Sequence, residues 1–223
     1  GQTPDWIWAK QFGGSSSDCG QAVTSDAMGN IYVAGYFSGI MIIGNDTLES
    51  TGATDMVIMK LSQTCYPLWF KQVPAPEGKF LYPESILLDN SGNIIVTGYF
   101  DAPGITIGGT VLNRTGNVDI FITKFSSSGN VTWAKSYGES GRQYRGSKVR
   151  SDASNNYYLI CSEGYYYSAM VKYNTNGQLV SDFPKTECQY RDIEIYNSSI
   201  YLTGTIEGYV EFGSTVLSNG KRS

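Results

Sequence analysis

The stretch "DNSGNIIVTGYF" (89–100) decides the fold because the chain repeats it. Sixty-three residues earlier the sequence is "DAMGNIYVAGYF" (26–37), and sixty-three residues later it is "DASNNYYLICSE" (152–163). A fourth, partial copy is "SIYLTGT" (199–205). Recurrence at a fixed interval indicates copies of one structural unit stacked side by side.

Each copy contains short β-branched and aromatic runs bounded by Gly, Asn and Ser, which is typical of strands. A second run follows in "DMVIMKL" (55–61) and "DIFITKF" (119–125), and a third in "PLWFKQ" (67–72) and "VTWAKS" (131–136). With one strand ahead of the D-x-x-G-N turn, each unit has four antiparallel strands, the content of one propeller blade. We therefore predict an all-β fold, a β-propeller-like array of four-stranded antiparallel blades with about three and a half repeats visible.

Residues 1–223 are predicted to form a single propeller-type repeat domain. Its units are expected at about 21–73, 84–137, 146–184 and 192–223, the last of them incomplete. Residues 5–12 contain "WIWAKQ", and we expect them to form the outer strand of a closing blade. Because the last unit stops where its third strand should begin, we expect a piece of a longer, ring-closing protein. Unpaired blade edges would then favour self-association.

Two residue types mark equivalent places in the units. Gly35, Gly98 and Gly204 stand in mid-strand, where glycine indicates close approach of a neighbouring backbone. We expect a branched side chain to be tolerated less well at Gly98 than at Gly116, which lies in an insert. The tryptophans of the W-x-K runs are expected at equivalent positions on outer strands, namely Trp8, Trp69 and Trp133.

Composition excludes several classes of function. Charged residues make up 16% of the 223 residues, the net charge is −4, and no basic stripe is present, which argues against nucleic-acid binding. No apolar run is long enough for a transmembrane segment, and the sequence contains no signal peptide. Because histidine is absent, Ser-His-Asp triads and His-based metal sites are excluded. We predict no cofactor, no metal and no catalytic residues.

The four cysteines, Cys19, Cys65, Cys161 and Cys188, form no C-x-x-C pair, so a zinc site is not indicated. Cys65 and Cys161 stand where other copies carry glycine, which favours small unpaired residues. Spacing leaves all three possible disulfide pairings open.

The stretch "WAKQFGGSSSDCGQAVTSDAMGNIYVAGYF" resembles the family of seven-bladed beta-propeller repeats, with its W-A-K-x-x-G-G, D-x-x-G-N and Y-V-x-G elements. The inserts "GNDTLESTGATDMVIMKL" and "GGTVLNRTGNVDIFITKF" resemble the version found in surface and secreted proteins of Gram-negative bacteria. This resemblance implies export to the medium or the cell surface and a role in extracellular scaffolding or binding. The family has no defined catalytic residues that could be carried over.

Antiparallel pairing places the short, uniform turns at one end of the blades and the long, variable connections at the other, where binding sites are usually built. The tripeptide "QYR" occurs there twice, at 143–145 and 189–191. We interpret its residues, together with Tyr82, as a possible anion or sugar clamp with stacking faces. The ligand-binding candidates are therefore Tyr82, Tyr144, Arg145, Tyr190 and Arg191. The simpler interpretation, which we favour, is packing between blades.

Three other features have structural interpretations. The tyrosines of "GYYYS" (164–168) either form a sugar platform or pack over a missing insert, and we favour packing. A glycosidase needs two carboxylates at a defined separation, but the acidic residues of the variable end differ between units; they are Asp18, Glu77, Glu84, Glu139 and Glu187. The recurring Asp26, Asp89 and Asp152 fit turn chemistry better than calcium, which requires more oxygen ligands.

We therefore predict a non-catalytic extracellular binding or scaffolding module, secreted or on the cell surface. Its partner would be an unknown protein or carbohydrate ligand, without nucleic acid. The first alternative is a propeller-fold carbohydrate-active enzyme, a glycosidase or lyase. The second is a structural spacer of a larger surface adhesin.

Overall fold

The computed structural model describes residues 9–164, 167–206, 209–212 and 215–218. These residues form strands, turns and connections, and the described part of the chain includes no helix that could cross a membrane. The predicted all-β fold built from four-stranded antiparallel sheets is confirmed.

Three sheets each contain four antiparallel strands in the order first, second, third and outermost. The first sheet consists of β1 (Asp18–Ser25), β2 (Ile31–Phe37), β5 (Asp55–Leu61) and β6 (Pro67–Val73). The second consists of β7 (Leu81–Leu88), β8 (Ile94–Phe100), β11 (Asp119–Phe125) and β12 (Val131–Tyr137). The third consists of β13 (Tyr144–Ser151), β14 (Tyr157–Glu163), β15 (Tyr167–Tyr173) and β16 (Leu179–Thr186). A fourth sheet pairs β17 (Cys188–Tyr196) with β18 (Ser199–Ile206).

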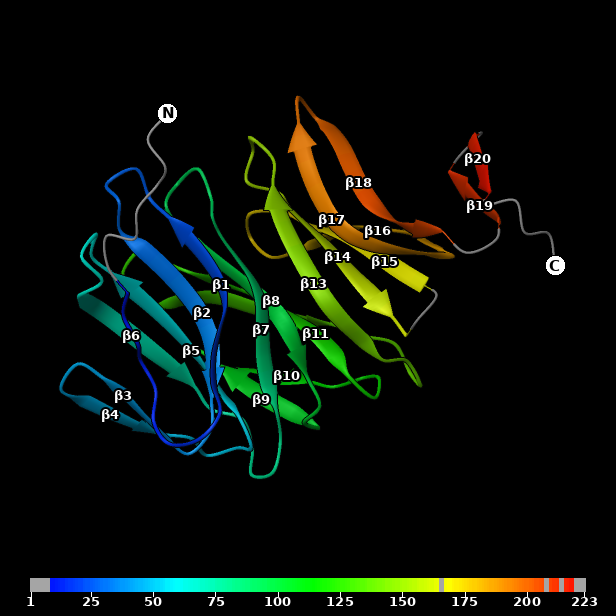
Figure 1. The fold of residues 1–223 in the computed structure, drawn as a ribbon. Coiled ribbons are helices and arrows are strands. Elements are labelled where there is room, and N and C mark those ends of the chain that lie inside the picture. The colour runs from blue at the N-terminus through cyan, green and yellow to red at the C-terminus, as the bar shows by residue number, and fades with distance from the viewer. Residues whose placement is uncertain (1–8, 165–166, 207–208, 213–214, 219–223) are drawn as a thin grey trace.

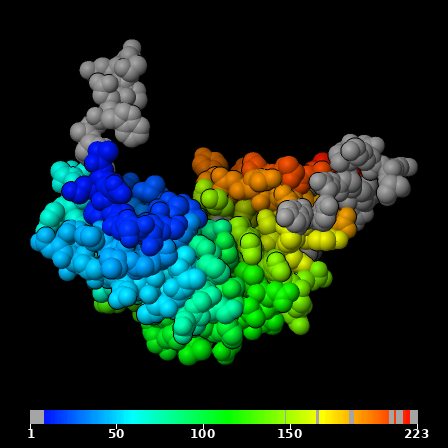
Figure 2. Space-filling model, turned by 60° about the horizontal axis from the view of Figure 1, so that its bottom comes forward, coloured from blue at the N-terminus to red at the C-terminus, as the bar shows by residue number. Residues whose placement is uncertain are grey.

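The sheets follow one another in chain order, from β1 and β2 in blue to β17 and β18 in orange (Figure 1). The space-filling view shows the same succession of colours around the molecule (Figure 2). The first strands of successive sheets, β1, β7, β13 and β17, contact one another and form the inner side of the array.

The long inserts fold into hairpins, which the sequence interpretation treated as loops. These hairpins are β3 (Ile40–Ile43) with β4 (Asp46–Glu49), β9 (Gly104–Ile107) with β10 (Thr110–Asn113), and β19 (Tyr209–Phe212) with β20 (Thr215–Ser218). The sequence did contain a hairpin signal for the second insert, the pair Gly108-Gly109. Both residues have positive φ and join β9 to β10. The hairpins have an apolar side, because Ile105, Ile107 and Leu112 are buried in the core.

The core is divided between the faces of neighbouring sheets. One apolar cluster, which includes Ile58 and Phe100, lies between the first and second sheets, and another, which includes Ile122 and Val149, lies between the second and third. A smaller cluster joins the third sheet to β17 and β18. Each sheet therefore depends on its neighbours for burial, as repeat architectures do.

A β-bulge near the start of each inner strand explains the mid-strand glycines. The pairing register shifts directly beside Gly35, Gly98 and Gly204. A Cβ atom at Gly98 would lie 1.9 Å from the carbonyl oxygen of Tyr82, and the other two glycines meet a carbonyl at 2.4 and 2.1 Å. Glycine is therefore required by close approach of the backbone, as the sequence predicted.

The tryptophans confirm the alignment of the first two units. Trp69 on β6 pairs with Lys60, and Trp133 on β12 pairs with Lys124, so both occupy the same position on an outermost strand. Trp8 lies outside the described residues. So do residues 5–8 of the predicted closing strand, and residues 9–12 are not in a strand.

The D-x-x-G-N turns are fastened by their aspartates. Asp26 accepts hydrogen bonds from the backbone of Met28 and Asn30 and from the Tyr32 hydroxyl, and Lys60 lies 4.0 Å away. These contacts support the interpretation of the recurring aspartates as turn residues.

In the second sheet the same arrangement is buried and reaches the next sheet. Lys124 Nζ lies 3.3 Å from Asp89 Oδ2 and donates to the Tyr157 hydroxyl at 2.9 Å. Tyr157 donates to Asp89 at 2.8 Å. Burial alone would raise the pKa of Asp89, but hydrogen bonds from Asn93, Tyr157 and Ser91 together hold it below its ordinary value.

Candidate ligand-binding groove

The bulges of β1, β7 and β17 each place one extra residue at the variable end of the array. These residues are Gln21, Glu84 and Arg191, which lie between the paired residues on either side of each register shift. Bulges near the end of a strand often redirect a side chain toward a functional site. All three residues line one hollow of about 310 Å³.

This hollow, the polar pocket, is shared by four inner strands. Besides the three bulge residues it is lined by Gly146, Lys148, Ser162 and Tyr190. The side chains of Lys148 and Arg191 are exposed. The pocket therefore presents two cations, one carboxylate and several hydrogen-bonding groups around a common space.

A second hollow of about 420 Å³, the aromatic slot, lies at the same end of the sheets. It is lined by Gln21, Tyr36, Phe80, Tyr82, Tyr99, Asp101, Val118 and Arg145. Its rings are in contact: Phe80 stacks on Tyr82 with 5.6 Å between centroids, and Tyr36 meets Tyr82 edge-on at 4.6 Å. Phe80 is 38% exposed, so an aromatic surface is open to solvent.

The two hollows are adjacent and form one surface, which we call the channel groove. Gln21 lines both of them. Arg145 lines the aromatic slot while the next residue, Gly146, lines the polar pocket. On β7, Tyr82 lines the aromatic slot and Glu84 lines the polar pocket. One extended ligand could therefore contact both halves.

The cations of the channel groove have no carboxylate partners among the described residues. Arg145, Lys148 and Arg191 are absent from the ion pairs of the described part of the chain. The Arg145 guanidinium lies 5.4 Å from the centroid of the Tyr99 ring. In contrast, Asp101 is 3.8 Å from Lys79 and accepts a hydrogen bond from the Phe80 backbone.

Tyr99 adds a hydrogen-bonding group to the slot. Burial raises the pKa of its hydroxyl above the ordinary value, and the nearby carboxylate of Glu84 raises it further. The hydroxyl therefore stays protonated at neutral pH and can donate a hydrogen bond.

The structure brings four of the five predicted site residues to the channel groove. Tyr82 and Arg145 line the aromatic slot, and Tyr190 and Arg191 line the polar pocket. The prediction of Tyr144 as a ligand-binding residue was wrong. Tyr144 is fully buried and packs edge-on against Tyr137, so it offers no face to a ligand. Tyr144 is the first residue of β13, and the first residues of β7 and β17, Leu81 and Cys188, are buried as well.

Sequence reasoning missed several further residues of the groove, among them Tyr36, Phe80, Tyr99 and Lys148. A signal for two of them existed, because Tyr36 and Tyr99 occupy the same place in the repeated "GYF" ending. Nothing in the local sequence of Phe80 or Lys148 indicates the groove, since their position depends on how neighbouring sheets pack.

Other predicted features do not assemble into a site. Residues 165 and 166 of "GYYYS" lie outside the described residues. Of the acidic set, Asp18 and Glu84 line different hollows. The described residues contain no group of three or more His, Cys, Asp or Glu side chains able to hold a metal, and the four cysteines are thiols.

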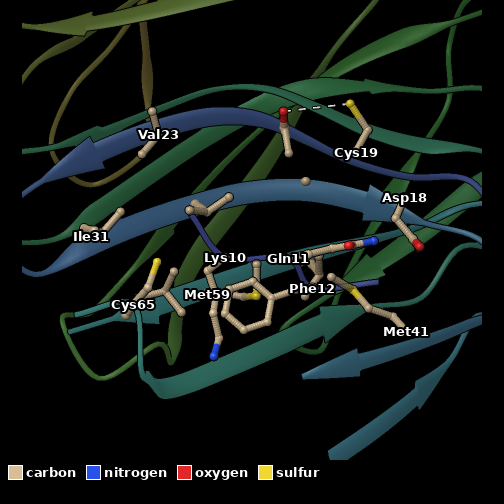
Figure 3. A pocket seen from close by; sticks show the side chains of 15 residues that line it. Lys10, Gln11, Phe12, Asp18, Cys19, Val23, Ile31, Met41, Met59 and Cys65 are labelled. Carbon is tan, nitrogen blue, oxygen red and sulfur yellow. Dashed lines mark hydrogen bonds between the residues drawn. The ribbon is translucent and has the colours of Figure 1, made fainter. Parts of the chain in front are cut away.

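A third hollow of about 410 Å³ lies on the outer face of the first sheet and is mostly apolar. Figure 3 shows its lining, with the Phe12 ring beside Met59 and with Val23 on β1. Val23 is 68% exposed, whereas the residues at the equivalent register in the later sheets, Ile86, Val149 and Ile193, are 7%, 0% and 1% exposed. This is the face that each later sheet packs against its predecessor.

Comparison with known proteins agrees with the fold. A model of the family described as "Beta-propeller repeat" matches residues 7–36. An uncharacterized WD repeat-containing protein of Acanthamoeba polyphaga mimivirus is 25% identical over 190 residues, which cover 72% of this chain and 13% of that protein. The chain thus spans a small part of the length of this relative. The chain thus resembles beta-propeller repeat proteins, and its four-stranded antiparallel sheets are consistent with propeller-like blades.

Proposed function

We propose that the chain is a non-catalytic binding module of an exported protein, with the channel groove as its binding site. The observation that carries this proposal is the coincidence of an exposed aromatic surface with three cations that lack carboxylate partners in the described residues. Concave sites that combine apolar rings with a few convergent polar groups are typical of ligand binding. The ligand would be a carbohydrate or the surface of another protein.

The test is binding by the purified chain to an array of immobilised glycans, compared with the double variant Arg145→Ala/Arg191→Ala. We expect the wild type to bind a subset of the glycans and the double variant to bind it more weakly. Absence of binding to every glycan, and to candidate surface proteins, would favour the second alternative, a structural spacer of a larger adhesin.

The first alternative, a glycosidase or lyase, is less well supported. The channel groove contains the carboxylates of Glu84 and Asp101, but Asp101 is engaged by Lys79 and by the Phe80 backbone. Prolonged incubation with polysaccharides should release no reducing ends and no unsaturated products. Release of either product, lost in Glu84→Gln, would establish an enzyme instead.

We also propose location in the medium or at the cell surface, on the basis of the resemblance to exported repeat proteins. Fractionation of cells that express the epitope-tagged full-length protein tests it: the tag should be accessible to protease added to intact cells. A tag found only after lysis would contradict this location.

Self-association is proposed through the uncovered ends of the array. The support is the exposed Val23 face and the edge of β18 that lies away from β17, along which no other described strand pairs. Light scattering of the wild type should show a mass above that of one chain, and Val23→Lys should reduce it. A single-chain mass at all concentrations would contradict the proposal.

A further inference from the structure

We propose that the channel groove recognises an acidic saccharide, a chain of uronic acid residues. One pyranose ring would lie against Phe80 in the aromatic slot, and the carboxylate of a neighbouring residue would lie between Lys148 and Arg191. This inference rests on the proposed function and names its class of ligand.

The aromatic slot suits the face of a sugar ring. Phe80 and Tyr82 are nearly parallel, with 11° between their planes, and Tyr36 supports Tyr82 edge-on with 88° between them. The ring stack is therefore held in place before a ligand arrives. A pyranose ring presents C–H groups on its face, which pack against a flat aromatic surface, while its hydroxyls stay at the edge.

Hydrogen-bonding groups surround this surface where the sugar hydroxyls would lie. Gln21, Asp101 and Tyr99 line the same hollow as Phe80. The Gln21 amide can donate to a sugar hydroxyl or accept from it, and the Asp101 carboxylate can accept from it. The slot alone therefore accounts for binding of a sugar ring, and this binding does not require the sugar to be charged.

The polar pocket favours a ligand that carries a negative charge. Lys148 and Arg191 are exposed, line the same 310 Å³ hollow and pair with no described carboxylate. The planar guanidinium of arginine matches the geometry of a carboxylate and can bind it through two parallel hydrogen bonds. Ser162 can donate a further hydrogen bond to the same group.

The charge balance of the channel groove differs from that of the whole chain. Arg145, Lys148 and Arg191 face the carboxylates Glu84 and Asp101, and Asp101 has Lys79 as its own partner. The chain carries a net charge of −4. A local excess of positive charge on an acidic protein attracts an anionic ligand to this place rather than to the surface at large.

The continuity of the two halves favours a ligand longer than a single sugar. Gln21 belongs to both hollows, and β13 contributes Arg145 to one and Gly146 and Lys148 to the other. An oligosaccharide with a carboxylate on each residue satisfies both halves at once. An isolated carboxylate or an isolated neutral sugar would satisfy one.

The experiment measures calorimetric binding of hexasaccharides of galacturonate, glucuronate and mannuronate, each compared with its methyl ester. The ester keeps the shape of the ring and removes the charge. We expect at least one acid to bind about tenfold or more tightly than its ester, and added salt to weaken the acid more than the ester.

Variants separate the two halves of the groove. Lys148→Ala and Arg191→Ala should each weaken binding of the acid about tenfold and weaken binding of the ester much less, because the ester carbonyl accepts hydrogen bonds but carries no charge. Phe80→Ala should weaken acid and ester alike. Lys135→Ala removes a lysine outside the channel groove and is the matched control, expected to change neither.

The outcomes distinguish this inference from the proposed function. Acids and esters that bind equally, or only neutral glycans that bind on the array, would overturn the acidic ligand and leave the binding module standing. No binding to any glycan or protein would overturn both. Tighter binding of a single-stranded oligothymidylate than of every uronate would show that phosphate chains are the ligand and would overturn the inference.

Discussion

The cations beside the D-x-x-G-N turns and three cations that line the channel groove differ in whether the fold pairs them with a carboxylate. At the turn end, where the D-x-x-G-N turns lie, Lys60 and Lys124 each pair with an aspartate and lie over a tyrosine ring. At the groove end, Arg145, Lys148 and Arg191 have no carboxylate partner among the described residues. A cation paired within the fold contributes to stability, whereas an unpaired one at the surface remains available to a ligand. Stability and binding should therefore respond to different mutations.

The largest effect is expected at Asp89. Its side chain is fully buried beside Lys124 and accepts a hydrogen bond from the Tyr157 hydroxyl. Asp89→Ala leaves a buried cation without its partner, which costs about 3–5 kcal/mol in the free energy of unfolding. Chemical denaturation measures this loss.

Asp26→Ala is the matched control in the first sheet, where the aspartate is partly exposed and 4.0 Å from Lys60. This control should lower the free energy of unfolding much less. Equal losses would contradict the special role of the buried pair.

The next largest effect is expected at the bulge glycines. Gly98→Ala places a Cβ 1.9 Å from the Tyr82 carbonyl oxygen, which we expect to cost about 1–3 kcal/mol or more through overpacking. The control is Gly104→Ala in the same repeat, where the nearest atom would be 3.3 Å away. Gly116 also lies close to backbone, because a Cβ there would be 2.6 Å from the Arg142 carbonyl oxygen; that a branched side chain is tolerated less well at Gly98 than at Gly116 stays a prediction. Indistinguishable midpoints for Gly98→Ala and Gly104→Ala would refute the close approach.

A smaller effect is expected from pH. The pKa of Asp89 and that of Asp152 are lowered in the folded chain, where hydrogen bonds outweigh the opposing effect of burial. A lowered carboxyl pKa contributes stability above the unfolded value of 3.8, and this contribution is lost as the pH falls through the folded value. The free energy of unfolding should therefore decline between about pH 5 and pH 2. Asp89→Asn should flatten this decline, and an unchanged pH profile in that variant would contradict the assignment.

The smallest change in stability is expected at the groove end. Lys148→Ala removes an exposed side chain without an ion pair among the described residues. It should alter the free energy of unfolding by no more than about 0.5 kcal/mol. Thermal and chemical denaturation both measure this. A loss comparable to that of Gly98→Ala would show that Lys148 is part of the packing.

The sequence predicted what is local and repeated. The D-x-x-G-N turns, the mid-strand glycines and the shared position of Trp69 and Trp133 all follow from chemistry within one unit. The hairpins in the inserts were missed although Gly108-Gly109 signalled one of them.

The site was harder to predict because it forms between units. Phe80 belongs to the slot only because it stacks on Tyr82 beside residues of two other sheets. Tyr144 shares the "QYR" tripeptide with Arg145, yet alternation along β13 sends its ring into the core. Such differences depend on packing across sheets, which the spacing of residues along the chain does not determine.

The separation of stability from binding is tested most directly by one pair of measurements on Arg145→Ala/Arg191→Ala. We expect a denaturation midpoint equal to that of the wild type, together with binding of the acidic hexasaccharides weakened about tenfold or more. A lowered midpoint would place these arginines among the packing contacts between sheets. An unchanged midpoint with unchanged binding would contradict the role of the channel groove.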